Sequence, residues 1–302
     1  MNVNLILVVI TGLGWGLLGP ASKALYAQSP AFDGVTLAIA RAVWAFPIFL
    51  IMLGLAWRAD PPRMRKRSWC AAIGAGLTFG LLISTLYTIA AQHTSVAHIS
   101  FFVGISPVTS TVLAALVFRL GLDRRTLVAL ALGVLGIALL ASTQHETAGA
   151  ASGDALMLVW LVAFGAYGIL LRAIGPGVSS TFVIALVGSI SMGVLIIPGI
   201  SLGYGGAIAH VVDSPPTGAW FFGEIVLGST LVAQATYAAA VRRLGVSMAT
   251  IGAEYTALAV GVAGSLALRE AWTPLTIVAG LIFCAALAVT FVPLPWLSIA
   301  ES

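Results

Sequence analysis

Positively charged residues alternate with long apolar segments along this chain of 302 residues. Eleven of the 14 Lys and Arg residues lie in every second gap between apolar segments, and the gaps in between are almost free of them. Multi-pass membrane proteins have this pattern because Lys and Arg are retained in the cytoplasmic loops. Only 8% of the residues are charged, whereas a soluble domain carries about a quarter. The pattern therefore predicts a membrane protein with several spans.

The apolar segments are long enough to be transmembrane helices. A helix needs about 20 apolar residues to cross a bilayer core of about 30 Å. Such segments cover approximately residues 3–25, 33–57, 69–92, 96–118, 125–142, 154–174, 180–203, 218–241, 247–268 and 273–294. We expect an all-α integral membrane protein with ten transmembrane helices. A tight turn is expected near residues 92–95, because one helix across both neighbouring segments would be too long for a single span.

The basic residues also predict the orientation. The gap after the second segment carries five of them between Arg58 and Arg67, the gaps after the fourth and eighth segments contain Arg, and Arg172 ends the sixth segment. The positive-inside rule places these gaps and both termini in the cytoplasm. Lys23 and Arg269 are expected near the outer side, against this bias. Since the net charge of +4 comes from these loops, we expect the lipid bilayer as a partner and no nucleic acid.

The two halves of the sequence resemble each other after a shift of 149 or 150 residues. The matched pairs are Tyr87 with Tyr237, Arg119 with Arg269, Trp15 with Phe164, and Lys23 with Arg172. Each half has five segments, an odd number, so the second half would be inserted upside down. We expect two inverted five-helix repeats, residues 1–143 and 144–302. In secondary transporters of this kind the substrate site lies near the membrane midplane between the repeats.

Four short motifs carry a family resemblance. They are GLGWGLLGPASKAL in the first segment, AIARAVWAF with Arg41 in the second, ISPVTSTVLAALVF in the fourth, and LALREAWTPLTIVAGLIF near the end. Together they resemble the drug/metabolite transporter superfamily, in its ten-helix EamA-type form. The sequence departs from the family pattern at Glu254, which Tyr255 follows in place of Pro, and around Leu120, where the family has Glu.

The resemblance implies a multi-pass protein of a bacterial-type cytoplasmic (inner) membrane that exports small organic solutes. By general character the chain is most similar to exporters of aromatic amino acids. No enzyme is expected, because the ten acidic residues are scattered and form no metal or nucleophile motif. Cys70 and Cys284 are far apart and give no disulfide framework, and no cofactor is expected.

Three ionisable residues are expected inside the membrane, where a charge is costly and usually faces a cavity or a partner. Glu254 is a candidate for binding a substrate ammonium or for proton movement, and a purely structural role is the alternative. Arg41 either holds a substrate carboxylate or braces its helix. Glu224 is nearer the outer boundary, and a structural role is expected there.

Aromatic residues form a second group of candidates. Tyr and Trp in the middle of a membrane need a polar partner, which a water-filled cavity provides. Such walls suit an aromatic or flat cationic substrate, although helix packing or lipid contact is the alternative. The candidates for substrate binding are Trp15, Trp44, Tyr87, Phe164, Tyr167, Tyr237 and Tyr255, together with Glu254.

A third group is expected to act in gating or as charges. Pro20 and Pro107 are hinge candidates, because a proline within a helix favours a kink. His93 lies beside the expected outer turn and titrates near physiological pH, and Lys23 and Arg41 are the charged members of this group.

These observations predict a secondary transporter that works by alternating access around a midplane cavity. Aromatic and related amino acids are the expected small-molecule substrates, and a multidrug exporter of flat organic cations is the alternative. Because the repeat supplies both halves of the pathway, the protein is expected to function as a monomer.

Overall fold

In the part of the chain that it describes, the computed structural model contains helices and the segments that connect them, and no strands. The described residues are 3–29, 32–119, 121–122, 124–142, 150–175, 177–204, 216–244 and 246–291. Leu120, the position of one departure from the family pattern, lies outside them.

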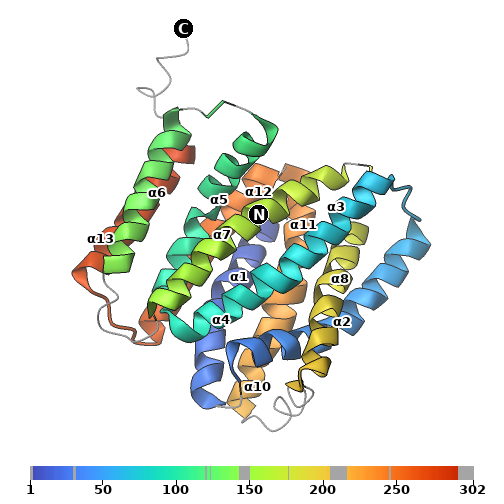
Figure 1. Ribbon diagram of the computed structural model, residues 1–302, viewed down its shortest axis with the longest axis horizontal. Coiled ribbons are helices and arrows are strands. Elements are labelled where there is room, and N and C mark those ends of the chain that lie inside the picture. Colours follow the sequence, from blue (N-terminus) through green and yellow to red (C-terminus); the bar gives the residue numbers. More distant parts are fainter. Residues whose placement is uncertain are drawn as a thin grey trace.

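The described residues form ten helical rods (Figure 1). The first five rods are α1 (Val3–Gln28), α2 (Gly34–Ala59), a third rod made of α3 (Lys66–Leu77), η1 (Thr78–Ser84) and α4 (Thr85–His93), then α5 (Val96–Phe118) and α6 (Arg124–Ser142). The other five are α7 (Ala150–Ile174), α8 (Ser180–Ser201), a rod made of α10 (Pro216–Gly223), η4 (Glu224–Val232) and α11 (Ala233–Leu244), then α12 (Val246–Ala267) and α13 (Pro274–Phe291).

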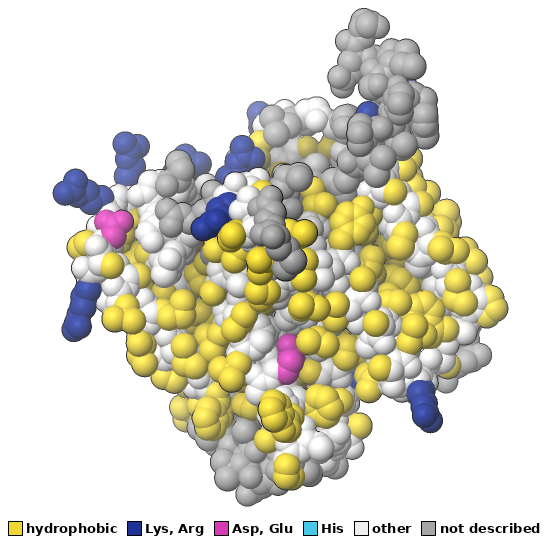
Figure 2. Space-filling model, turned by 180° about the vertical axis from the view of Figure 1, so that it is seen from behind, with side chains coloured by type: hydrophobic (Ala, Val, Ile, Leu, Met, Phe, Trp, Pro, Cys, Tyr) yellow, Lys and Arg dark blue, Asp and Glu magenta, His cyan; other side chains and the backbone are white. Residues whose placement is uncertain are grey.

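The helices have the length and surface of a membrane protein. Among the described residues, seven helices are long and apolar enough to cross a bilayer, and Pro274–Val289 is a shorter apolar helix. Figure 2 shows a broad hydrophobic surface with most of the visible Lys and Arg gathered at one end. The expectation of an all-helical, multi-pass membrane protein is therefore confirmed.

Local capping explains where several helices begin and end. Asp33 accepts a hydrogen bond from the Thr36 amide at the start of α2, and Ser95 accepts one from the His98 amide at the start of α5. Such caps satisfy amides that have no partner within the helix. Since α4 ends at His93 and α5 begins at Val96, the tight turn expected at residues 92–95 is confirmed.

Similar features recur at matching positions of the two halves. Arg119 follows the end of α5 with a φ of 53°, and Arg269 follows the end of α12 with a φ of 56°. No other described residue except glycine has a positive φ, and this backbone region is uncommon for such residues. A π-helical segment also interrupts the third rod, at η1, and the eighth, at η4.

The packing pairs a helix of one half with a helix of the other. α1 packs against α12 and the η4–α11 rod, while α7 packs against α5 and the α3–η1–α4 rod. α2 packs against α8, and α6 lies beside α13 at one edge of the bundle (Figure 1). Glycines allow these close approaches: a Cβ at Gly16 would lie 2.8 Å from the Ala257 carbonyl oxygen of α12. This packing leaves a cavity in the middle of the bundle.

Candidate functional site

The central cavity lies where helices of both halves meet. Its lining residues come from α1, α2, the third rod, α5, α7, α11 and α12, and they are Trp15, Leu18, Arg41, Phe79, Ile83, Ser84, Tyr87, Val103, Trp160, Phe164, Gln234 and Glu254. The cavity volume available to water-sized spheres is about 50 Å³. This volume has room for roughly four waters. A solute as large as an amino acid enters only when side chains or helices move apart.

Aromatic rings form most of the apolar wall. Trp160 stacks on Phe164 with ring centroids 4.9 Å apart, and Tyr87 meets the edge of Trp160 at 6.1 Å. Trp15 lies 6.4 Å from Phe164 and 4.9 Å from Tyr237. The rings therefore form a continuous chain from α4 through α7 to α1 and α11.

Arg41 is the cationic residue of the cavity. Its side chain is only 3% exposed, and its Nε donates a hydrogen bond to the Thr230 hydroxyl of η4. Thr230 in turn donates to the Ile225 carbonyl at 2.6 Å, which caps a carbonyl within the π-helical segment. Glu224 interacts with Arg41 electrostatically, and both of its carboxylate oxygens are buried without a hydrogen-bond partner among the described residues. This arrangement links α2 of the first half to η4 of the second.

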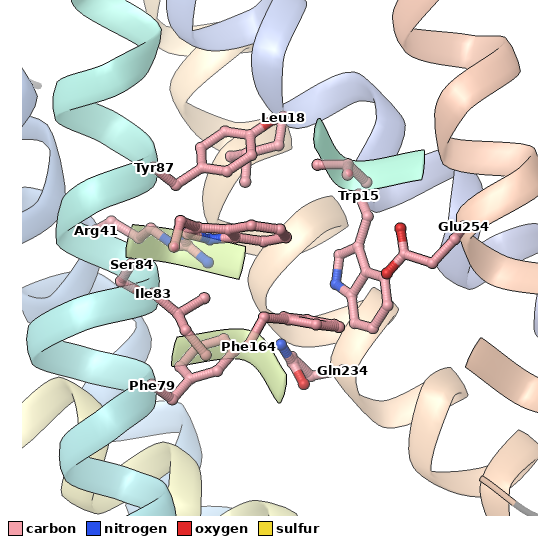
Figure 3. A pocket seen from close by; sticks show the side chains of 12 residues that line it. Trp15, Leu18, Arg41, Phe79, Ile83, Ser84, Tyr87, Phe164, Gln234 and Glu254 are labelled. Carbon is pink, nitrogen blue, oxygen red and sulfur yellow. The ribbon is translucent and has the colours of Figure 1, made fainter. Parts of the chain in front are cut away.

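Glu254 is the acidic residue of the cavity, and it lies on the side opposite Arg41 (Figure 3). The residue is 1% exposed, and its Oε2 has no hydrogen-bond partner among the described residues. Trp15 lies between Glu254 and the rest of the cavity in Figure 3. A buried carboxylate without a full set of hydrogen bonds is costly, so a cationic group or a proton would stabilise it.

A smaller pocket adjoins the central cavity. Phe79 and Gln234 line both spaces, and Tyr167 lines the smaller one, where its ring lies 5.3 Å from Phe79. The Tyr237 ring lies 4.9 Å from that of Trp15, and its hydroxyl shares a hydrogen bond of 2.7 Å with the Thr250 hydroxyl. Tyr167 and Tyr237 therefore support the walls of the central cavity without lining it.

Several predicted site residues lie elsewhere. Trp44 is 44% exposed and Tyr255 is 38% exposed, so both are on the outer surface of the bundle. Pro20 packs against α12, where a Cβ at Gly264 would lie 2.2 Å from its Cγ. Pro107 is buried within α5, and its carbonyl accepts a hydrogen bond of 2.9 Å from Thr111.

The last two candidates lie at the end of the bundle where α4 and α5 meet. His93 is exposed at the end of α4. Lys23 lies close enough to Glu270 to interact with it electrostatically. The structure thus brings together Trp15, Arg41, Tyr87, Phe164 and Glu254.

Seven lining residues were not among the candidates for substrate binding or gating: Leu18, Phe79, Ile83, Ser84, Val103, Trp160 and Gln234. Ser84 and Gln234 are 150 residues apart, so the shift that aligns the two halves pairs them. This pairing of polar residues could have indicated that both lie at the site. Trp160 is an aromatic residue one turn before Phe164, which places both on one helix face. Phe79 had no comparable signal, because phenylalanine is common in membrane helices.

These features define a multi-pass membrane protein with a central cavity lined by helices of both halves. Residues 3–142 match the EamA-like transporter family, so the first half of the chain contains an EamA-like transporter domain. A domain of this family indicates a membrane transporter of small solutes rather than an enzyme.

The remaining comparisons concern the fold. No curated protein matches the sequence. Thirteen chains among the solved structures match. One of them, titled only "Crystal structure of protein", has 15% sequence identity and a TM-score of 0.62, with 98% of this chain and 98% of that chain covered. At this identity the likeness shows that the two chains share a fold, and it says nothing about the substrate.

Proposed function

We propose that this protein is a secondary transporter that exports aromatic and related amino acids by alternating access. The observation that carries the proposal is the central cavity, which combines an aromatic wall with one buried cation and one buried anion on opposite sides. An aromatic amino acid has the same three parts, namely a flat ring, a carboxylate and an ammonium.

Each part of the substrate has a partner in the cavity. The substrate ring stacks among Trp15, Trp160 and Phe164, because offset or edge contacts between rings are favourable. The carboxylate pairs with Arg41, whose guanidinium has five N–H donors, of which Nε already serves Thr230. The ammonium pairs with Glu254, whose Oε2 would gain a partner. A purely cationic drug would leave Arg41 facing a like charge, so the cavity favours a zwitterion over a flat cation.

Alternating access follows from the proposed inverted repeat of residues 1–143 and 144–302. Its support is the matched positive φ of Arg119 and Arg269, the π-helical segments in the third and eighth rods, and the reciprocal packing of α1 with α12 and of α7 with α5. Rocking of the two halves about the cavity would expose it to each side in turn.

The orientation, location and assembly belong to the same proposal. Both termini face the cytoplasm, because the basic gaps of the sequence lie on their side. The protein resides in a bacterial-type inner membrane and functions as a monomer, since one chain contributes every wall of the cavity.

Uptake into proteoliposomes tests the substrate. Radiolabelled tryptophan and phenylalanine are supplied with and without a pH gradient, and a labelled flat organic cation and a labelled aliphatic amino acid are run in parallel. Saturable uptake of the aromatic amino acids above that of empty liposomes supports the proposal, and dependence on the gradient assigns proton coupling. Uptake of the cation alone would replace the proposal with the multidrug alternative.

A further inference from the structure

The turn between α4 and α5 is held by residues of the second half. This turn, at Thr94 and Ser95, lies at the predicted outer end of the bundle. Thr94 is buried although it lies in a turn. The segment that covers it is the start of α7, where a Cβ at Gly153 would lie 2.8 Å from both the Cβ and the amide nitrogen of Thr94. The absence of a side chain at Gly153 allows this close contact.

Asp154 makes two polar contacts across the boundary between the halves. Its Oδ1 accepts a hydrogen bond of 2.5 Å from the Thr94 hydroxyl, and its Oδ2 lies 3.0 Å from Nδ1 of His98. All three side chains are buried. Hydrogen bonds to a carboxylate are about twice as strong as neutral ones, and loss of one partner would leave buried polar groups unsatisfied.

Glu270 makes a second connection at the same end. It lies in the segment between α12 and α13, and its carboxylate accepts hydrogen bonds from the Val96 amide at 2.8 Å and the Ala97 amide at 3.2 Å. These amides are at the N-terminus of α5, where the helix dipole favours a negative charge. Lys23 of α1 adds an electrostatic interaction with the same carboxylate. We call the contacts of Asp154 and Glu270 the outer interlock.

When the two halves are aligned by the shift of 149 or 150 residues, no acidic residue of the first half matches Asp154 or Glu270. Glu270 corresponds to Leu120, and Asp154 corresponds to Asn4 or Leu5. Thr94 corresponds to Leu244. At the opposite end, α7 and α5 make a cation–π contact, with the Arg172 guanidinium 5.5 Å from the Phe118 ring centre. Among the described residues, the hydrogen bonds that carboxylates make between the halves therefore lie at one end of the bundle.

We propose that the outer interlock holds the two halves together at the predicted outer end, so that the substrate-free protein rests with its cavity closed to the outside. Asp154 and Glu270 are positioning residues, because they touch the α4–α5 segment and not the cavity. A ligand shifts a conformational equilibrium only by its different affinity for the two states. The interlock sets the starting point of that equilibrium, and an exporter that starts open to the cytoplasm is ready to receive its substrate. This inference rests on the alternating access of the proposed function.

Chemical labelling of a cavity cysteine tests the proposal. The reporter is Val103→Cys, because Val103 lines the cavity and lies seven residues into α5 from the interlocked turn. It is placed in a background with Cys70→Ser and Cys284→Ser. A membrane-impermeant thiol reagent is added to right-side-out and inside-out vesicles, and no substrate is present. Failure of the proposed substrate class would therefore not affect the readout.

Asp154→Asn and Glu270→Gln are expected to raise the rate of outside labelling about tenfold, because each replaces a charge-assisted connection that favours one state. Labelling from the inside is expected to fall. Asp33→Asn is the matched control, since Asp33 is a carboxylate at the same end that caps α2 within the first half only. Its labelling rates should equal those of the reporter alone.

Thr94→Val removes the hydroxyl that donates to Asp154. This variant replaces Asp154→Asn in the test if Asp154→Asn does not fold. Melting temperature and elution profile establish folding for each variant. Unchanged outside labelling in folded Asp154→Asn or Thr94→Val, and in folded Glu270→Gln, would overturn the proposal. Fast outside labelling of the reporter without any further substitution would overturn it as well.

Discussion

Replacement of Trp15 by leucine tests the aromatic wall most sharply. Trp15 lines the cavity and contacts two further rings, Tyr237 at 4.9 Å and Phe164 at 6.4 Å between centroids. Leucine keeps an apolar side chain at this position but removes the ring. The substitution therefore separates ring stacking from simple hydrophobic contact.

The structure gives two magnitudes for Trp15→Leu. An aromatic pair contributes about 0.5–1.5 kcal/mol beyond its buried area, so loss of two pairs is expected to cost roughly 1–3 kcal/mol of stability. Loss of one ring contact with the substrate, at about 1 kcal/mol, corresponds to a roughly fivefold weaker affinity. We expect the KM for tryptophan to rise by about this factor.

The assay compares Trp15→Leu with Trp44→Leu. Trp44 is 44% exposed on the outer surface of the bundle, so its loss should leave KM unchanged and stability within about 0.5 kcal/mol. Initial uptake rates over a range of tryptophan concentrations give KM, and thermal unfolding in detergent gives stability. Equal KM values for the two folded variants would refute the argument that the Trp15 ring contacts the substrate.

Three further substitutions test other parts of the account. Glu254→Gln is expected to lower tryptophan uptake about tenfold or more, because a hydrogen bond to a charged group contributes about 1.5–3 kcal/mol; uptake equal to that of the unmodified protein would remove Glu254 from the substrate site. Arg41→Lys is expected to raise KM about tenfold while the protein stays folded, because lysine cannot present paired N–H donors to a carboxylate; an unchanged KM would assign Arg41 to helix bracing. Gly80→Ala is expected to cost about 1–3 kcal/mol in thermal unfolding, because overpacking strains a close helix contact and a Cβ there would lie 2.3 Å from the Ser191 carbonyl oxygen. Gly54→Ala is its control, with nothing within 4 Å of the added Cβ, and equal melting temperatures would contradict the packing argument.

The sequence predicted the helices well, because their lengths follow from the thickness of the bilayer. The expected segment at residues 3–25 corresponds to α1, Val3–Gln28, and the expected segment at 96–118 is that of α5, Val96–Phe118. The π-helical segments η1 and η4 were not predicted. They depend on where a carbonyl finds a partner, as in the hydrogen bond from Thr85 to the Gly80 carbonyl, and apolar periodicity contains no such information.

The site was predicted only in part, because both faces of a membrane helix are apolar. Glu254 and Tyr255 are neighbours in sequence and therefore point about 100° apart around the helix; with Glu254 in the cavity, Tyr255 lies on the surface. Trp44 is three residues after Arg41 and therefore close to the same face of α2, yet Trp44 is exposed and Arg41 is buried. In a soluble protein the polar face of a helix would have shown which residues point inward.

The most direct test of the central claim is solute counterflow. Proteoliposomes loaded with unlabelled tryptophan are diluted into buffer with a trace of labelled tryptophan, and the label inside is followed over time. An alternating-access carrier exchanges one molecule for another, so the account predicts a transient accumulation of label above its outside concentration. Label that only rises to the outside concentration, or that never exceeds the level in empty liposomes, would contradict the proposal of an alternating-access carrier for aromatic amino acids.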